Sequence, residues 1–165
     1  MLNVRAKVRY LDASALVKLV VDEGDHQPIR NYFYANVNFF ATSLCLGEAL
    51  GVLKAKLNYK KITDEQYFLS TRQLVIDAWG KRIEIAKLNL FSPAGLTAVE
   101  ELAKKHSLDL SDALQLETIL RGDHSHMVLD SAPILVTADA KLATAAREEN
   151  ICTWNCIVDP LPEWA

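Results

Sequence analysis

The feature that most constrains the fold is a regular alternation of short apolar runs with longer segments of helical period. The apolar runs predict strands at residues 8–12, 39–42, 82–86, 134–137 and 151–154. The segments between them predict helices at residues 13–21, 26–35, 44–59, 64–79, 93–106, 109–121 and 140–150. Such alternation implies right-handed crossovers and a mostly parallel sheet covered on both faces. We therefore expect an α/β fold, arranged as a three-layer α/β/α sandwich.

Within the predicted helix 44–59, leucines recur at spacings of three and four and predict the stripe that packs on the sheet, at Leu46, Leu50, Leu53 and Leu57. The 165 residues contain no repeat and no linker, so we expect a single domain over residues 1–165. The net charge of −3 and pI near 5.8 argue against a broadly basic surface that grips nucleic acid.

The cysteines and the apolar stretches indicate a soluble protein of the cytoplasm. Cys45, Cys152 and Cys156 lie in apolar sequence without Cys-x-x-Cys spacing, which predicts reduced, packed thiols rather than a disulfide framework or zinc site. The longest uncharged stretch, residues 31–47, is too short and too polar to span a membrane. We expect no membrane segment and no signal peptide.

Four acidic residues fall where a parallel sheet binds its ligands, outside the carboxyl ends of the strands. Asp12 ends the first predicted strand, and Asp139 follows the fourth. Glu48 lies in the second turn of the helix after the second strand, with Ser43 as the expected N-cap, and Asp112 lies in the opening turn of its helix. The sequence predicts that these four side chains project toward one edge of the sheet.

Each acid also has an ordinary structural interpretation. Asp12 and Asp139 could be helix N-caps, and Asp109 with Asp112 could form a first-turn pair that complements the helix dipole. Glu48 is harder to explain in this way, because it sits past the first turn among mostly apolar neighbours.

Four carboxylates at one edge would repel each other unless a cation lay among them. Mg²⁺ and Mn²⁺ prefer carboxylate and water oxygens and are often held by only one or two carboxylates together with substrate phosphates. An acidic cluster without His or Cys therefore indicates metal-assisted attack of water on a phosphodiester.

In the order and spacing of these motifs the chain resembles the PIN-domain ribonucleases, and is most similar to the VapC-like toxins of toxin–antitoxin modules. The matching stretches are residues 10–18, Thr42 and Ser43 with Glu48, residues 108–114 and residues 135–142. The resemblance implies a parallel sheet of four to five strands of Rossmann-like, PIN-like layout, Mg²⁺ or Mn²⁺ as cofactor, and endonucleolytic cleavage of RNA. It also implies an antitoxin partner and a homodimer.

Carried across by position, the resemblance assigns catalysis and metal binding to Asp12, Glu48, Asp112 and Asp139. Ser14 and Thr137 are the expected hydroxyl supports of the site. The long segment 122–133 departs from the family pattern.

Other residues bear on substrate binding. Lys18 and Lys141 stand closest in sequence to the acids and are the expected phosphate contacts.

Most residues of the aromatic patch at 32–40 should be core, although a helical face such as Tyr32, Phe33 and Asn36 could also form a dimer or antitoxin groove. An i, i+2 histidine pair without a third ligand, His124 and His126, predicts a solvated loop.

Two rival functions remain. The first is a non-catalytic PIN-like interaction module that acts through a protein partner. The second is a phosphate-handling enzyme or receiver domain, which fits less well because no phospho-acceptor Asp follows residues 82–86 and no second Asp follows Asp12. Without the four proposed ligands, 17 acids (21 − 4) face 18 bases, so the overall acidity is no argument against an enzyme that acts on RNA.

Overall fold

The computed structural model describes residues 7–88, 92–127 and 131–164. It contains five strands: β1 (Val8–Leu11), β2 (Phe39–Thr42), β3 (Ile83–Ala86), β4 (Pro133–Thr137) and β5 (Cys152–Asn155). The described helices are α1 (Ala13–Val20), α2 (Gln27–Ala35), α3 (Ser43–Asn58), α4 (Asp64–Trp79), α5 (Pro93–His106), α6 (Leu110–Arg121) and α7 (Ala140–Glu148). Every predicted strand and helix is therefore present, with ends displaced by at most two residues.

All five strands are parallel and lie in the order β3-β2-β1-β4-β5. Tyr10 of β1 pairs with Phe40 of β2 on one side and with Leu135 of β4 on the other. The chain builds outward from β1 in one direction and from β4 in the other, so the strand order reverses between these two strands. Ligands of open parallel sheets bind at such a switch point.

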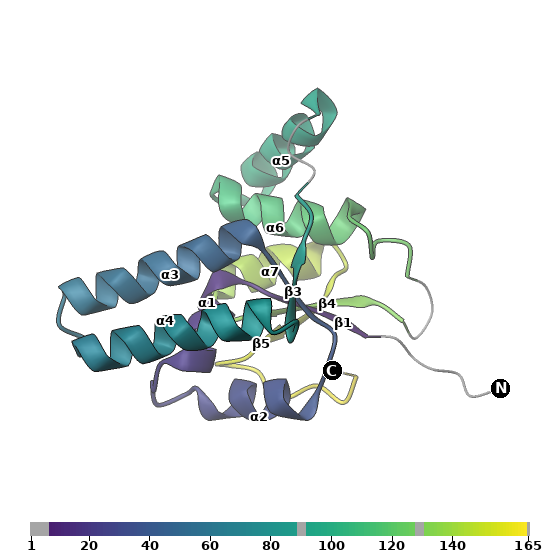
Figure 1. Ribbon diagram of the computed structural model, residues 1–165. Coiled ribbons are helices and arrows are strands. Elements are labelled where there is room, and N and C mark those ends of the chain that lie inside the picture. The colour runs from purple at the N-terminus through teal and green to yellow at the C-terminus, as the bar shows by residue number, and fades with distance from the viewer. Residues whose placement is uncertain (1–6, 89–91, 128–130, 165) are drawn as a thin grey trace.

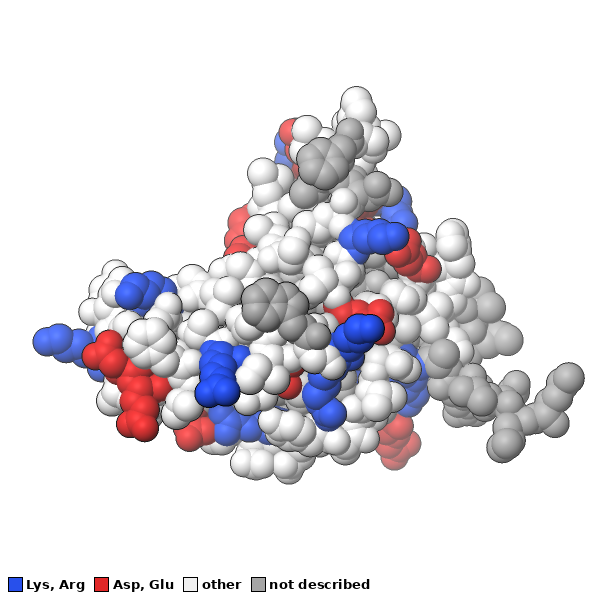
Figure 2. Space-filling view, viewed as in Figure 1, with Lys and Arg blue, Asp and Glu red and all other residues white. Residues whose placement is uncertain are grey.

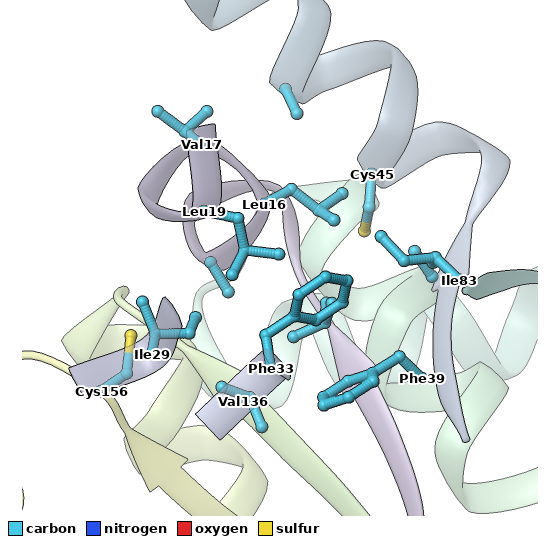
Figure 3. Packing of buried hydrophobic residues seen from close by; sticks show 14 of the residues in the cluster. Leu16, Val17, Leu19, Ile29, Phe33, Phe39, Cys45, Ile83, Val136 and Cys156 are labelled. Carbon is cyan, nitrogen blue, oxygen red and sulfur yellow. The ribbon is translucent and has the colours of Figure 1, made fainter. Parts of the chain in front are cut away.

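Seven helices cover the described sheet in two layers, as predicted (Figure 1). Because side chains alternate along a strand, Leu11 and Val136 face one layer, while Tyr10 and Leu135 face the other. The first layer packs buried residues of α1–α4 against the sheet, and the second packs those of α5–α7. In Figure 3 the first core gathers around Phe33, with side chains of α1, α3 and the strands about it. The fold is the expected three-layer α/β/α sandwich.

The packing stripe of α3 differs from the leucine stripe that we predicted. The fully buried line is Cys45, Ala49 and Leu53, whereas Leu46 and Leu50 are half-buried at its margin. Helix α3 packs against other helices, α1 and α4, more than against the sheet, and a close helix pair favours small side chains at the contact. Its N-cap is Thr42 rather than Ser43, because the Thr42 hydroxyl accepts the Cys45 N–H at 3.0 Å.

Several smaller expectations are corrected. Cys152 is exposed at the start of β5, so only Cys45 and Cys156 are packed thiols. Tyr32 and Phe33 are at most 3 % exposed, so of the expected groove face only Asn36 reaches the surface, and it does so in part. His126 is exposed, as predicted, but His124 is only partly exposed: its Nδ1 lies 2.8 Å from the Tyr10 hydroxyl and its ring packs on Phe40.

The segment 122–133 thus uses its first residues to cover part of the sheet, because His124 packs on β1 and β2. Residues 128–130 lie outside the described part. Among the described helices none is long and apolar enough to cross a membrane.

Candidate functional site

The four predicted acids line a single cavity of about 600 Å³ at the switch point. They come from four separate segments: Asp12 follows β1, Glu48 lies on α3, Asp112 lies in the first turn of α6 and Asp139 follows β4. The sequence prediction that these residues share one edge of the sheet agrees with this placement.

Asp12 is the most deeply buried of the four, at 4 % exposure, and it is held by a dense set of donors. Its carboxylate accepts the Ala15 N–H at 2.8 Å, as the N-cap of α1, and the hydroxyls of Ser14 and Thr137 at 2.9 and 2.8 Å. Both hydroxyls also accept backbone N–H groups, Ser14 from Ala138 and Thr137 from Asp139. The expected hydroxyl supports therefore tie the end of β1 to the end of β4.

Asp139 caps α7, where its carboxylate accepts the N–H groups of Lys141 and Leu142 at 2.7 and 2.9 Å. Its backbone N–H is fixed by Thr137, so the residue follows β4 with a defined direction. The cap interpretation is thus correct for both Asp12 and Asp139. A carboxylate oxygen that caps a helix keeps further lone pairs, so capping and cation binding are compatible.

Glu48 is half-buried on the cavity side of α3, one turn beyond Cys45. The same face of the helix continues as Gly51, Val52 and Ala55, which form a floor of small side chains. A Cβ atom added at Gly51 would meet no heavy atom within 4 Å. The cavity therefore extends along α3 away from the acids.

Asp112 is brought into the cavity by the cap of its helix. Asp109 is the N-cap of α6, and its carboxylate accepts the Asp112 N–H at 2.9 Å. Asp109 also lines the cavity. Burial, followed by the charges of Asp109, Asp139, Asp12 and Glu48, raises the pKa of Asp112 to about 7. The four predicted acids and Asp109 thus act on one another electrostatically.

Burial also raises the pKa of Asp12 to about 6, against the lowering effect of its hydrogen bonds, and the charge of Asp139 adds to the rise. Two carboxyl groups with raised pKa values in one cavity mark a place where positive charge would be favourable. The donor set, all carboxylate and hydroxyl oxygen, fits Mg²⁺ or Mn²⁺ rather than a softer metal.

No three His, Cys, Asp or Glu side chains stand together as a chelating group within residues 7–88, 92–127 and 131–164. Direct coordination by one or two carboxylates, with water filling the remaining positions, is the usual mode for Mg²⁺. The carboxylates that line the cavity fit such an ion, which Asp12, Asp112 and Asp139 would hold directly or through water.

The two lysines expected to contact phosphate lie in different surroundings. Lys18 lines the cavity, and its ammonium bonds Glu23 at 2.6 Å and Asp25. Lys141 instead donates to the Ser107 carbonyl between α5 and α6, and the cavity lining does not include it.

Glu23 and Lys56 also line the cavity. Sequence reasoning passed over Glu23 and took Lys56 for part of a solvated charged face rather than a phosphate contact. Lys56 could have been found, because Glu48, Val52 and Lys56 recur at four-residue spacing on one helix face. Glu23 carried no signal, because it stands in the irregular connection between α1 and α2.

No protein-family model and no curated protein matches the chain. Among solved structures, the fold is similar to the crystal structure of PAE2754 from Pyrobaculum aerophilum, at 17 % sequence identity and a TM-score of 0.55 over 84 % of each chain. The likeness shows the fold alone. It bears out the α/β architecture of a parallel sheet between two helical layers.

Proposed function

We propose that the protein is a metal-dependent endoribonuclease of the PIN class that hydrolyses RNA phosphodiester bonds with Mg²⁺ or Mn²⁺. The observation that carries the proposal is the convergence of Asp12, Glu48, Asp112 and Asp139 on one cavity at the switch point, with raised pKa values at Asp12 and Asp112. The resemblance of the ordered motifs to VapC-like toxins supplies the reaction class.

A bound Mg²⁺ or Mn²⁺ would supply positive charge for the scissile phosphate and lower the pKa of a water molecule. Asp12 and Asp112 would hold it, with Asp139 beside them. Glu48 stands on the opposite helix and would accept the proton of the attacking water at its carboxylate. Ser14 and Thr137 hold the Asp12 carboxylate in a fixed orientation through their hydroxyl donors.

The resemblance further supports a toxin of a cytoplasmic toxin–antitoxin pair that forms a homodimer and is restrained by an antitoxin protein. The surface agrees with a local RNA site, because blue and red groups are interspersed on the face in Figure 2 and form no broad basic area there. RNA binding would then depend on local potential within the cavity rather than on net charge.

The test is cleavage of single-stranded RNA by the purified protein with Mn²⁺. The parent should cleave, and Asp12→Asn should lose at least about a hundredfold in rate, while Glu100→Gln, an exposed acid of α5 outside the cavity, should match the parent. Intact RNA with the parent protein, together with no Mn²⁺ binding, would refute the proposal, as would full activity of Asp12→Asn.

The rival function is the non-catalytic PIN-like interaction module. Calorimetric titration of Mn²⁺ separates the two. The nuclease should lose affinity in Asp112→Asn, whereas an interaction module would bind the ion equally weakly with and without this carboxylate.

A further inference from the structure

The cavity that holds the acids continues past them to a pair of lysines. At its far end Lys18 of α1 and Lys56 of α3 both bond to the carboxylate of Glu23, and Lys18 also bonds Asp25. The Lys18 side chain is only 13 % exposed, although it carries a charge. Along α3, the eight residues from Glu48 to Lys56 correspond to about 12 Å of helix.

A second cavity, of about 720 Å³, adjoins the first, because Glu23 and Lys56 line both. Its walls carry Arg30 and Lys61 as cations, with polar side chains of α4 beside them, and Arg30 forms an ion pair with Asp22 of the same wall at 2.6 Å. Tyr34 also lines it. The Arg82 guanidinium lies over the Tyr34 ring, 5.3 Å from its centroid, yet the residue is still 62 % exposed, which leaves part of the ring open for contact. Cations combined with an exposed aromatic ring are the features by which proteins hold single-stranded nucleic acid.

The contact between the two cavities is therefore an ion-pair bridge, Lys18–Glu23–Lys56. The Glu23 carboxylate accepts from two ammonium groups on two different helices, as a phosphodiester oxygen pair would. The place between the two lysines where a phosphate could bind is therefore occupied by the Glu23 carboxylate.

We propose that the two cavities form one path for single-stranded RNA, in which Lys18 and Lys56 bind a backbone phosphate in place of Glu23 and Tyr34 stacks on an unpaired base. This inference rests on the proposed function, because the acids mark the end of the path where the chain is cut. Glu23 acts as a competing internal anion, so it weakens the binding of RNA and keeps the two cavities apart in the free protein.

Equilibrium binding of a labelled single-stranded RNA of about ten nucleotides, measured in EDTA so that no cleavage occurs, tests the path. Tyr34→Ala should bind about fivefold to a hundredfold more weakly, which is the effect of losing one stacked base. Lys56→Met should bind more weakly and lower the slope of log affinity against log salt by about one. Glu23→Gln should bind more tightly than the parent.

Two matched controls lie outside both cavities: Phe68→Ala, an aromatic ring of α4 that is 66 % exposed, and Lys104→Met, an exposed lysine of α5. Both should bind like the parent. The RNA in a fully paired duplex should bind less well, because its bases are not available to Tyr34.

Equal affinity of the parent, Tyr34→Ala, Lys56→Met and Glu23→Gln would overturn the inference, and so would tighter binding of polyglutamate than of RNA. Such a result leaves the proposed function standing if the parent still cleaves RNA with Mn²⁺. If the variants bind as expected but the parent never cleaves, the path is confirmed and the proposed function fails.

Discussion

Replacement of Asp12 by Asn should stabilise the metal-free protein at pH 8 while removing its response to Mn²⁺. Burial raises the pKa of this carboxyl from 3.8 to about 6. The stability that its protonated form contributes is therefore complete below pH 3.8 and is lost as the pH rises through 6. Above that pH the folded protein carries a buried charge that costs up to about 3 kcal/mol, at 1.36 kcal/mol per pKa unit.

Asparagine removes this charge and keeps the hydrogen bonds. Its carbonyl can accept the Ala15 N–H, and its amide can donate to the hydroxyl oxygen of Thr137 or Ser14. Metal-free Asp12→Asn should thus melt up to about 6–12 °C above the parent at pH 8, for a chain of this size. The two proteins should converge near pH 4, where the parent carboxyl is largely protonated.

Thermal unfolding followed by circular dichroism at pH 4 and pH 8, with EDTA or with Mn²⁺, measures these differences. Mn²⁺ should raise the melting temperature of the parent at pH 8 and leave that of Asp12→Asn nearly unchanged. A variant that is less stable than the parent at pH 8 without metal, or a difference that does not change between the two pH values, would refute the reasoning.

Three further outcomes are expected. The affinity for Mn²⁺ in calorimetric titrations should rise between pH 6 and 8, because the pKa of Asp112 is raised to about 7 and the carboxyl must lose its proton to bind; an affinity independent of pH would contradict this. Leu53→Ala should lower the free energy of unfolding in urea by about 2–5 kcal/mol, since Leu53 is completely buried between helices, and a loss below 1 kcal/mol would argue against that packing. Thr42→Ala should lower it by about 1 kcal/mol more than Thr42→Ser, because both lose the buried methyl group but only alanine loses the α3 cap, and equal losses would contradict the cap.

Sequence reasoning works for the architecture because short apolar runs and helical periods are local signals. It also places Asp12 and Asp139, since a residue that follows a parallel strand lies at the carboxyl edge wherever the strand stands in the sheet. Local signals do not give the order of the strands, which puts β1 beside β4 and so joins Asp12 to Thr137 across 125 residues.

The features that the sequence did not reveal depend on long-range contacts. The anion that neutralises Lys18 comes from an irregular connection whose path no periodicity describes. Lys141 is drawn away from the cavity by the carbonyl of Ser107, 34 residues earlier. His124 lies in a polar stretch that suggests exposure, yet its ring contacts Tyr10 of β1 and Phe40 of β2.

Gly51, which lines the cavity, is a position where a substitution could block the cavity without unfolding the protein. Gly51 lies inside α3, where Gly is less favourable than Ala by about 1 kcal/mol, and no neighbour crowds the position of its missing Cβ. The fold therefore does not require this glycine, and what it maintains is empty volume beside Glu48. A larger helix-forming residue at position 51, such as Leu, would fill the cavity beside Glu48 and stabilise α3. The resulting protein would be folded and blocked, with all four carboxylates unchanged.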